Sequence, residues 1–131
     1  MKILIIDDTG AVRDFLRDIL EGKFGHEIYE AHNAYAALRN RDVLEGCDLI
    51  ITDMQMPGGS GLEFLQAYKR SVRNNVPVLV HSSDNVFRAE GGWVLNLSSD
   101  IPKSFPFAEF HPKQRDANID YILDFITRKG K

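Results

Sequence analysis

The sequence has little of several features that mark particular classes of protein. It contains a single cysteine among 131 residues, which excludes an internal disulfide and a cysteine-only zinc site. No apolar run reaches the length of a transmembrane helix, and the chain turns acidic at Asp7, too early for a signal peptide. These absences predict a cytoplasmic protein without a membrane segment. Cys47 lies just before an apolar run, so we expect it to be a packed core thiol.

A large excess of either charge is also missing. The formal net charge is −3 at pH 7, so the sequence carries no electrostatic footprint for nucleic acid. An apolar content of 44% excludes a disordered chain. There is no repeat or low-complexity tract, and the length suits one domain that spans residues 1–131.

Short apolar runs alternate with helical periodicity along the chain, and this alternation predicts an α/β fold. The runs predict buried strands at 2–6, 26–30, 48–52 and 76–80. A first helix should follow the first strand and stop at Gly22.

Three further helices carry their own signals. Asn33 is a cap for a helix from residue 34 to about residue 43, and Ser60 with Glu63 forms a capping box for the next helix. The last helix shows a clear buried stripe, which consists of Ile119, Ile122, Leu123 and Ile126.

The segment 84–112 interrupts this alternation. An ordinary amphipathic helix does not fit across Gly91-Gly92 and the prolines at 102 and 106. We therefore expect an irregular insertion here in place of a regular helix. The segment also carries five aromatic residues, namely Phe87, Trp93, Phe105, Phe107 and Phe110.

Three carboxylates follow two of the predicted strands. Asp7 and Asp8 close the first strand, and Asp53 closes the strand at 48–52. In an open parallel sheet, ligand sites lie at the carboxyl ends of the strands, so the three acids would converge if these strands are neighbours. Like charges at such close range repel, and a divalent cation relieves that repulsion. The pattern predicts hard-metal chemistry with an Asp as nucleophile or ligand.

At these separations, three motifs together resemble the receiver domains of two-component response regulators. They are Asp7-Asp8, the run Asp53-Met54-Gln55-Met56-Pro57-Gly58-Gly59-Ser60-Gly61, and the run Pro77-Val78-Leu79-Val80-His81-Ser82-Ser83. The resemblance implies a doubly wound five-stranded parallel sheet of flavodoxin-like order 2-1-3-4-5. The fourth helix would be remodelled or replaced.

The resemblance also implies roles for individual residues. Asp53 matches the phosphoacceptor, whose carboxylate becomes an acyl phosphate. Asp8 and Asp53 would hold Mg²⁺ together with the backbone carbonyl of Gln55. Asp7 would orient metal-bound water, and Ser82 matches the switch hydroxyl.

The family also has a lysine that ends the fifth strand and pairs with the phosphoryl group. Lys103 lies at nearly the usual distance from Ser82, but it leaves roughly fifteen residues before the last helix stripe. Lys113 follows an acceptable strand at 107–111 and has Phe110 at the position of the family's aromatic switch residue. We expect Lys113 to be the switch lysine. Neither lysine precedes the family's proline, because the next residues are Ser104 and Gln114.

Other polar and aromatic residues have two interpretations each. His81 and His111 would face each other if the fourth and fifth strands are neighbours, either as a metal-binding or pH-sensing pair or as ordinary strand-end residues. The aromatic residues of 84–112 are either core cover or a partner surface, with Trp93 or Phe107 as its anchor.

The resemblance implies a stand-alone or excised receiver that takes a phosphoryl group on Asp53 from a histidine kinase or phosphotransfer protein. It implies that the chain has no enzymatic activity other than its own Mg²⁺-dependent phosphorylation and dephosphorylation. The output would be a contact with a protein target through the 84–112 region and the last helix. We expect neither nucleic acid nor membrane as a partner.

Two rival functions come from other classes. The first is a receiver-like interaction module that never takes phosphate, which the unusual 84–112 segment favours. The second is an aspartate-dependent phosphatase of the haloacid-dehalogenase type, but that family places its acids as Asp-x-Asp, whereas Asp7 and Asp8 are adjacent. A mononucleotide-binding loop after the first strand is also disfavoured, because the same two acids would repel a phosphate.

Overall fold

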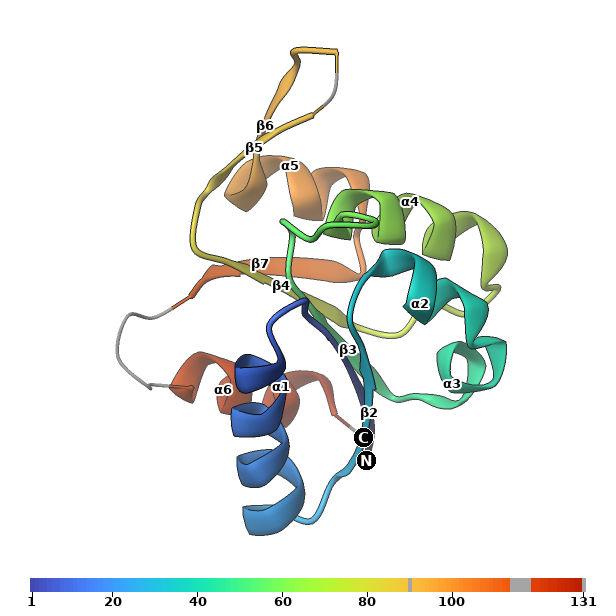
Figure 1. Cartoon of the computed structure of the whole chain (residues 1–131), viewed down its shortest axis with the longest axis vertical. Helices are drawn as coiled ribbons and strands as arrows, with labels where there is room; N and C mark the ends of the chain where they lie inside the picture. Colours follow the sequence, from blue (N-terminus) through green and yellow to red (C-terminus); the bar gives the residue numbers. More distant parts are fainter. Residues whose placement is uncertain (90, 114–118, 131) are drawn as a thin grey trace.

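A five-stranded parallel sheet lies between two layers of helices (Figure 1). The computed structural model describes residues 1–89, 91–113 and 119–130. The strand order is β2-β1-β3-β4-β7, which confirms the predicted doubly wound sheet with β7 as its fifth strand. The strands are β1 Lys2–Ile6, β2 Glu27–Ala31, β3 Leu49–Thr52, β4 Val78–Ser82 and β7 Ala108–Pro112.

Helices cover both faces of this sheet. The elements α1 Gly10–Arg17, η1 Asp18–Lys23 and α6 Asp120–Lys129 lie on one face. The other face is covered by α2 Ala34–Arg39, α3 Arg41–Gly46, α4 Gly61–Ser71 and α5 Leu97–Ser104.

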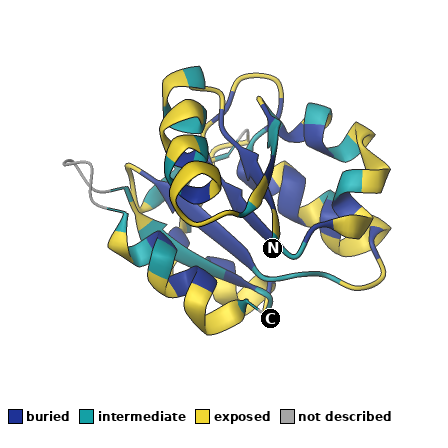
Figure 2. Ribbon diagram, turned by 90° about the horizontal axis from the view of Figure 1, so that it is seen from below, coloured by how far each residue is buried: buried dark blue, intermediate teal, exposed yellow. Residues whose placement is uncertain are grey.

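The central strands are buried on both faces, which is why they are apolar throughout (Figure 2). Their side chains alternate between two cores. Leu4, Ile50 and Val80 belong to the core beneath α2 to α5. Ile5 and Leu79 belong to the core beneath α1 and α6. Cys47 is buried in the first of these cores, as the sequence predicted.

The first helix extends beyond its predicted stop at Gly22. It continues as the π-helical segment η1 to Lys23, and the chain leaves it at Gly25, whose φ is 73°. The Gly25 N–H donates to the carbonyl of Glu21, and the His26 N–H donates to that of Leu20. The prediction was wrong because Gly25, not Gly22, adopts the left-handed conformation that ends helices.

The predicted helix over residues 34 to 43 is in fact two helices. Asn33 caps α2 by accepting a hydrogen bond of 2.9 Å from the Ala36 N–H, as expected. Asn40 then ends α2 and caps α3, because its side chain accepts from the Val43 N–H at 3.4 Å. An asparagine inside a helical pattern competes for backbone donors, and this competition explains the break.

The segment 84–112 is more regular than the sequence predicted. A hairpin of β5 Val86–Arg88 and β6 Val94–Asn96 projects from the body of the molecule (Figure 1). Gly91 and Gly92 form its turn with φ of 93° and 86°. The helix α5 then occupies the layer where we expected no regular helix.

The helix α5 tolerates Pro102 because of its buried stripe. Leu97, Ile101 and Phe105 recur every four residues and are at most 5% exposed. Burial of such side chains contributes about 1.5–3 kcal/mol each. Together they outweigh the roughly 3 kcal/mol that an interior proline costs a helix. Pro102 itself is exposed.

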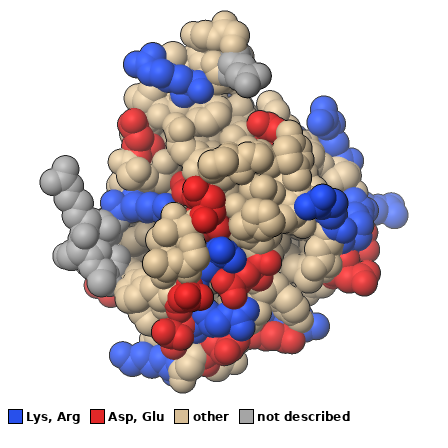
Figure 3. Space-filling model, in the orientation of Figure 1, with Lys and Arg blue, Asp and Glu red and all other residues tan. Residues whose placement is uncertain are grey.

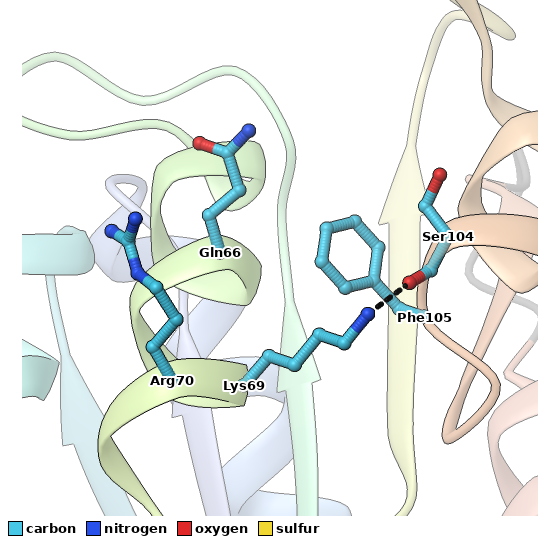
Figure 4. Close-up of a pocket in the computed structure, with 5 residues that line it drawn as sticks. All are labelled: Gln66, Lys69, Arg70, Ser104 and Phe105. Carbon is cyan, nitrogen blue, oxygen red and sulfur yellow. Dashed lines mark hydrogen bonds between the residues drawn. The ribbon is translucent and has the colours of Figure 1, made fainter.

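An open hollow separates α4 from α5. Lys69 reaches across it from α4 and donates a 3.0 Å hydrogen bond to the Ser104 carbonyl (Figure 4). The same ammonium lies 5.7 Å from the centroid of the Phe105 ring. The hollow is lined by Gln66, Lys69, Arg70, Ser104 and Phe105.

The two ends of the described chain lie near each other, beside β1 and β2 (Figure 1). The Met1 ammonium lies 3.2 Å from His26 Nδ1, and its carbonyl accepts from the Glu27 N–H at 2.9 Å. A Cβ added to Gly130 would lie 2.7 Å from Met1 Cε.

Lys and Arg side chains intermingle with Asp and Glu over the lower part of the face in Figure 3. Among the described helices, none is long and apolar enough to cross a membrane.

Candidate functional site

Three carboxylates meet at the carboxyl edge of the sheet. Because Ile6 pairs with Thr52 in the β1–β3 register, Asp7 and Asp53 leave neighbouring strands at the same level. One oxygen from each of Asp7, Asp8 and Asp53 lies within 4.8 Å of the others. Asp7 is fully buried and Asp53 is 6% exposed, whereas Asp8 faces solvent. The structure thus brings together the three acids that the sequence singled out.

Lys113 joins these acids from the end of β7. Its ammonium lies 3.1 Å from Asp53 Oδ2 and 3.3 Å from Asp7 Oδ2. Its backbone N–H donates to the Ser82 carbonyl at 2.9 Å, which ties the end of β7 to the end of β4. Lys103, the other lysine considered, is an exposed residue of α5. Lys113 is therefore the lysine that ends the fifth strand of the sheet.

Burial and charge shift the pKa values of this group in a consistent way. Burial raises the pKa of Asp53, and the nearby Asp7 adds to that rise, although Lys113 opposes it. Burial by itself would lower the pKa of Lys113, but Asp53 and Asp7 together outweigh it and raise the net value. The ammonium thus stays charged between the two carboxylates, so it compensates their crowding.

The loop after β3 holds Asp53 in place. The Met54 N–H donates to Asp53 Oδ1 at 2.7 Å, and Gln55 follows in the same loop. At Gly61 the backbone passes so close to the backbone of Asp53 that a Cβ on Gly61 would clash with the carbonyl oxygen of Asp53. Ser60 then starts α4 by accepting from the Glu63 N–H at 3.2 Å, which confirms Ser60 as the cap, while the Glu63 carboxylate accepts from the Tyr35 hydroxyl at 3.0 Å. The glycine thus serves close backbone approach beside Asp53.

The two remaining predicted switch residues occupy different positions. Ser82 is 1% exposed at the end of β4, and its hydroxyl accepts from the Asp84 N–H at 3.5 Å. Phe110 is partly buried in β7 and packs against the core beneath α4 and α5. Neither residue lies on the exposed hairpin.

A histidine and a tyrosine lie behind the acids. His81 and His111 are register partners on β4 and β7, as expected if those strands are adjacent. The Tyr121 hydroxyl lies 3.4 Å from His81 Nδ1, and its ring stacks on His111 with centroids 5.0 Å apart. Tyr121 was not among the predicted site residues, although an aromatic side chain with a polar tip in the first turn of α6 was a usable signal.

Comparison with known proteins identifies this arrangement. A family model described as the response regulator receiver domain matches residues 3–113. A protein-glutamate methylesterase/protein-glutamine glutaminase of Treponema pallidum is 32% identical over all of this chain, which covers 32% of that protein. The KDP operon transcriptional regulatory protein KdpE of Escherichia coli is 38% identical over 88% of this chain, which covers 50% of it.

Solved structures agree with the family model. The response regulator protein TrrA of Thermotoga maritima, in complex with Mg²⁺-BeF, gives a TM-score of 0.72 at 26% identity, covering 97% of this chain and 96% of that one. The receiver domain of the hybrid histidine kinase CckA gives a TM-score of 0.73 at 20% identity over the whole of both chains. The fold and the site define a response-regulator module of two-component systems. This chain belongs to the response regulator receiver domain family.

Proposed function

We propose that this receiver domain accepts a phosphoryl group on Asp53 from a histidine kinase or phosphotransfer protein, and thereby switches a contact with another protein. The observation that supports the proposal most directly is the position of Asp53 among Asp7, Asp8 and Lys113. A buried carboxylate set between acids and an ammonium suits a nucleophile that works with a bound cation.

The donor set fits Mg²⁺. Asp8 and Asp53, with the carbonyl of Gln55, would hold the ion, and Asp7 would orient its water. All of these groups offer oxygen, which Mg²⁺ prefers, and so few protein ligands leave room for the waters that it retains. The bound ion would neutralise charge on the transferring phosphoryl group.

In the proposed step, an oxygen of Asp53 forms a bond to phosphorus. The bond between phosphorus and the imidazole nitrogen of the donor histidine breaks, and that nitrogen keeps the electron pair. Lys113, already 3.1 Å from Asp53 Oδ2, then pairs with the phosphoryl oxygens. Ser82 supplies the hydroxyl that turns toward them. The domain performs no chemistry on other substrates in this proposal, and water later hydrolyses its acyl phosphate.

The proposed output surface is the β5–β6 hairpin with α5 and α6. Trp93 is 49% exposed at the hairpin, whereas Phe107 packs between Tyr68 and Phe105. Of the two anchors considered, Trp93 is thus the accessible one. Trp93→Ala should weaken capture of the protein target without changing phosphorylation. Unchanged capture would place the output surface elsewhere.

A single substitution tests the proposed chemistry. Incubated with a small acyl-phosphate donor and Mg²⁺, the wild-type chain should gain the mass of one phosphoryl group, and Asp53→Asn should gain none. The reason is that an amide is a poor nucleophile of nearly the same shape. Chelation of Mg²⁺ should abolish the gain in the wild type. An undiminished gain in Asp53→Asn would overturn Asp53 as the acceptor.

The same experiment separates the main rival. A receiver-like module that works without phosphate would bind its protein target equally well before and after treatment with the donor, and the wild type would gain no mass. The projecting hairpin is the observation that favours this rival.

A further inference from the structure

A histidine with an unused ring nitrogen lies behind the acidic site. His81 is 2% exposed near the end of β4. Its Nε2 has no hydrogen-bond partner among the described residues, and it lies 3.7 Å from Asp7 Oδ2. A buried polar atom without a partner costs about 1–3 kcal/mol, so its position beside a carboxylate calls for an explanation.

The other ring nitrogen of His81 faces helix α6. The Tyr121 hydroxyl lies 3.4 Å from His81 Nδ1, close enough for a long hydrogen bond. The Tyr121 ring is fixed by its stack on His111, with an angle of 22° between the planes. Tyr121 thus approaches His81 from the first turn of α6.

Charge selects one tautomer of His81. Burial, followed by the charge of Lys113, lowers the pKa of His81 to about 3, so the ring is neutral near pH 7. Burial raises the pKa of Tyr121 to about 12, which keeps its hydroxyl proton. A bare Nε2 lone pair would repel the Asp7 carboxylate, whereas an Nε2–H attracts it. The proton therefore belongs on Nε2, and Nδ1 accepts from Tyr121.

We propose that Tyr121 and His81 form a hydrogen-bond relay that positions Asp7, in which His81 Nε2–H replaces the Lys113 ammonium on Asp7 Oδ2 once Lys113 pairs with a phosphoryl group on Asp53. This inference rests on the proposed function. His81 and Tyr121 act here as positioning residues.

The relay follows from the single acceptor that Lys113 and His81 share. Asp7 Oδ1 accepts from the Thr9 N–H at 2.9 Å, so only Oδ2 is at issue. Before phosphorylation, Lys113 lies 3.3 Å from Oδ2 while His81 Nε2 remains at 3.7 Å. When Lys113 turns to the phosphoryl group, Oδ2 loses the ammonium, and only the metal-bound water that Asp7 would orient remains as its donor. His81 is the buried donor placed to close that gap, and Tyr121 would follow it.

Nuclear magnetic resonance of the imidazole nitrogens tests the tautomer. In the wild-type chain, His81 should carry its proton on Nε2, and its Nε2–H signal should shift when Mg²⁺ and beryllofluoride, a phosphoryl mimic, are added. In Tyr121→Phe, which keeps the ring but removes the hydroxyl, the proton should stay on Nε2 because Asp7 remains, while the Nδ1 signal should shift because its donor is lost. A proton found on Nδ1 in the wild type would overturn the relay.

Binding measurements test the positioning role. Without beryllofluoride, the Mg²⁺ dissociation constant of His81→Leu and Tyr121→Phe should match that of the wild type, because Lys113 holds Asp7. With Mg²⁺ present, beryllofluoride should bind about tenfold more weakly to His81→Leu and about threefold more weakly to Tyr121→Phe, the scale of one hydrogen bond. Tyr29→Phe is the matched control, because the Tyr29 hydroxyl donates to exposed Glu27.

The outcomes separate this relay from the proposed function. A wild-type chain that binds no beryllofluoride with Mg²⁺ overturns both. Two outcomes with a wild type that binds beryllofluoride overturn the relay alone. In the first, both variants bind beryllofluoride as tightly as the wild type. In the second, the variants lose affinity for Mg²⁺ alone by the same factor as they lose affinity for beryllofluoride. If His81→Leu does not fold, Tyr121→Phe still decides, because only a hydroxyl is removed.

Discussion

Lys113 is the charge that balances the acidic site, and its removal has a specific expected result. Lys113→Ala should still gain one phosphoryl group on Asp53, because the nucleophile is intact. The backbone amide shifts that accompany phosphorylation near Ser82 should disappear, since no cation follows the phosphoryl group. Intact mass and amide spectra measure the two effects. Lys103→Ala is the control, and it should behave like the wild type. The reverse pattern would assign the switch to α5.

Cys47 gives a pH dependence of stability with a definite sign. Burial raises the pKa of its thiol from 9.0 to about 11. The folded chain therefore keeps this proton where the unfolded chain has lost it, so the stabilisation is complete below pH 9 and is lost as the pH rises toward 11.

The difference in unfolding free energy between wild type and Cys47→Ala should accordingly shrink by roughly 2 kcal/mol over that interval. Urea unfolding from pH 8 to pH 11 measures it. Comparison of the two variants cancels the titration of other groups. A constant difference across this range would contradict the assignment of the buried thiol as neutral.

At the level of residues, the sequence could predict the positions of the site residues that follow strands, but little else of the site. Asp7 and Asp53 leave the neighbouring strands β1 and β3, and Lys113 follows β7, which lies beyond β4; all three meet because these parallel strands end at one edge of the sheet. The contact between Tyr121 and His81 depends on how α6 lies across the sheet, which no local pattern encodes. The role of each residue in phosphoryl transfer stays a prediction until it is measured.

At the level of elements, α5 shows why helix rules based on one residue can mislead. The sequence contains Leu97, Ile101 and Phe105 at helical spacing, but the prolines at 102 and 106 led us to expect no regular helix there. Tertiary burial outweighed local propensity. The strands were easier to predict, because a strand buried on both faces is apolar at every position.

Pro102 therefore offers a way to stabilise the domain. Pro102→Ala restores an N–H to the interior of α5 and should raise the unfolding free energy by about 1 kcal/mol or more. Pro102 is exposed, so the change removes no core packing. Pro106→Ala, also exposed but outside the helix, should not raise it. Urea denaturation compares the two. Equal effects would show that α5 carries no strain at Pro102.

At the level of the whole molecule, a bound cation should stabilise the fold. Mg²⁺ that binds only the folded chain adds about 2.7 kcal/mol at a concentration one hundred times its dissociation constant, which corresponds to roughly 10 °C in melting temperature for a domain of this size. Calorimetry with and without Mg²⁺ measures the shift. A melting temperature insensitive to Mg²⁺ would count against the metal site.

Asp8→Ala is the matched variant for this measurement. It should lose the response to Mg²⁺, because it removes a ligand. In metal-free buffer it should melt above the wild type, since one of three crowded carboxylates is gone. A variant that keeps the full Mg²⁺ response would show that the ion binds away from Asp8.

The meeting of Met1 with Gly130 means that the order of elements along the chain is not fixed by the fold. A short linker can join the two ends beside β1 and β2, and a new start can be cut at Gly91-Gly92, where the backbone is exposed. Such a circular permutant would leave every parallel pairing of the sheet intact. It would also place both new ends on the hairpin. Reporter groups fused there would lie beside Trp93 rather than beside β1 and β2.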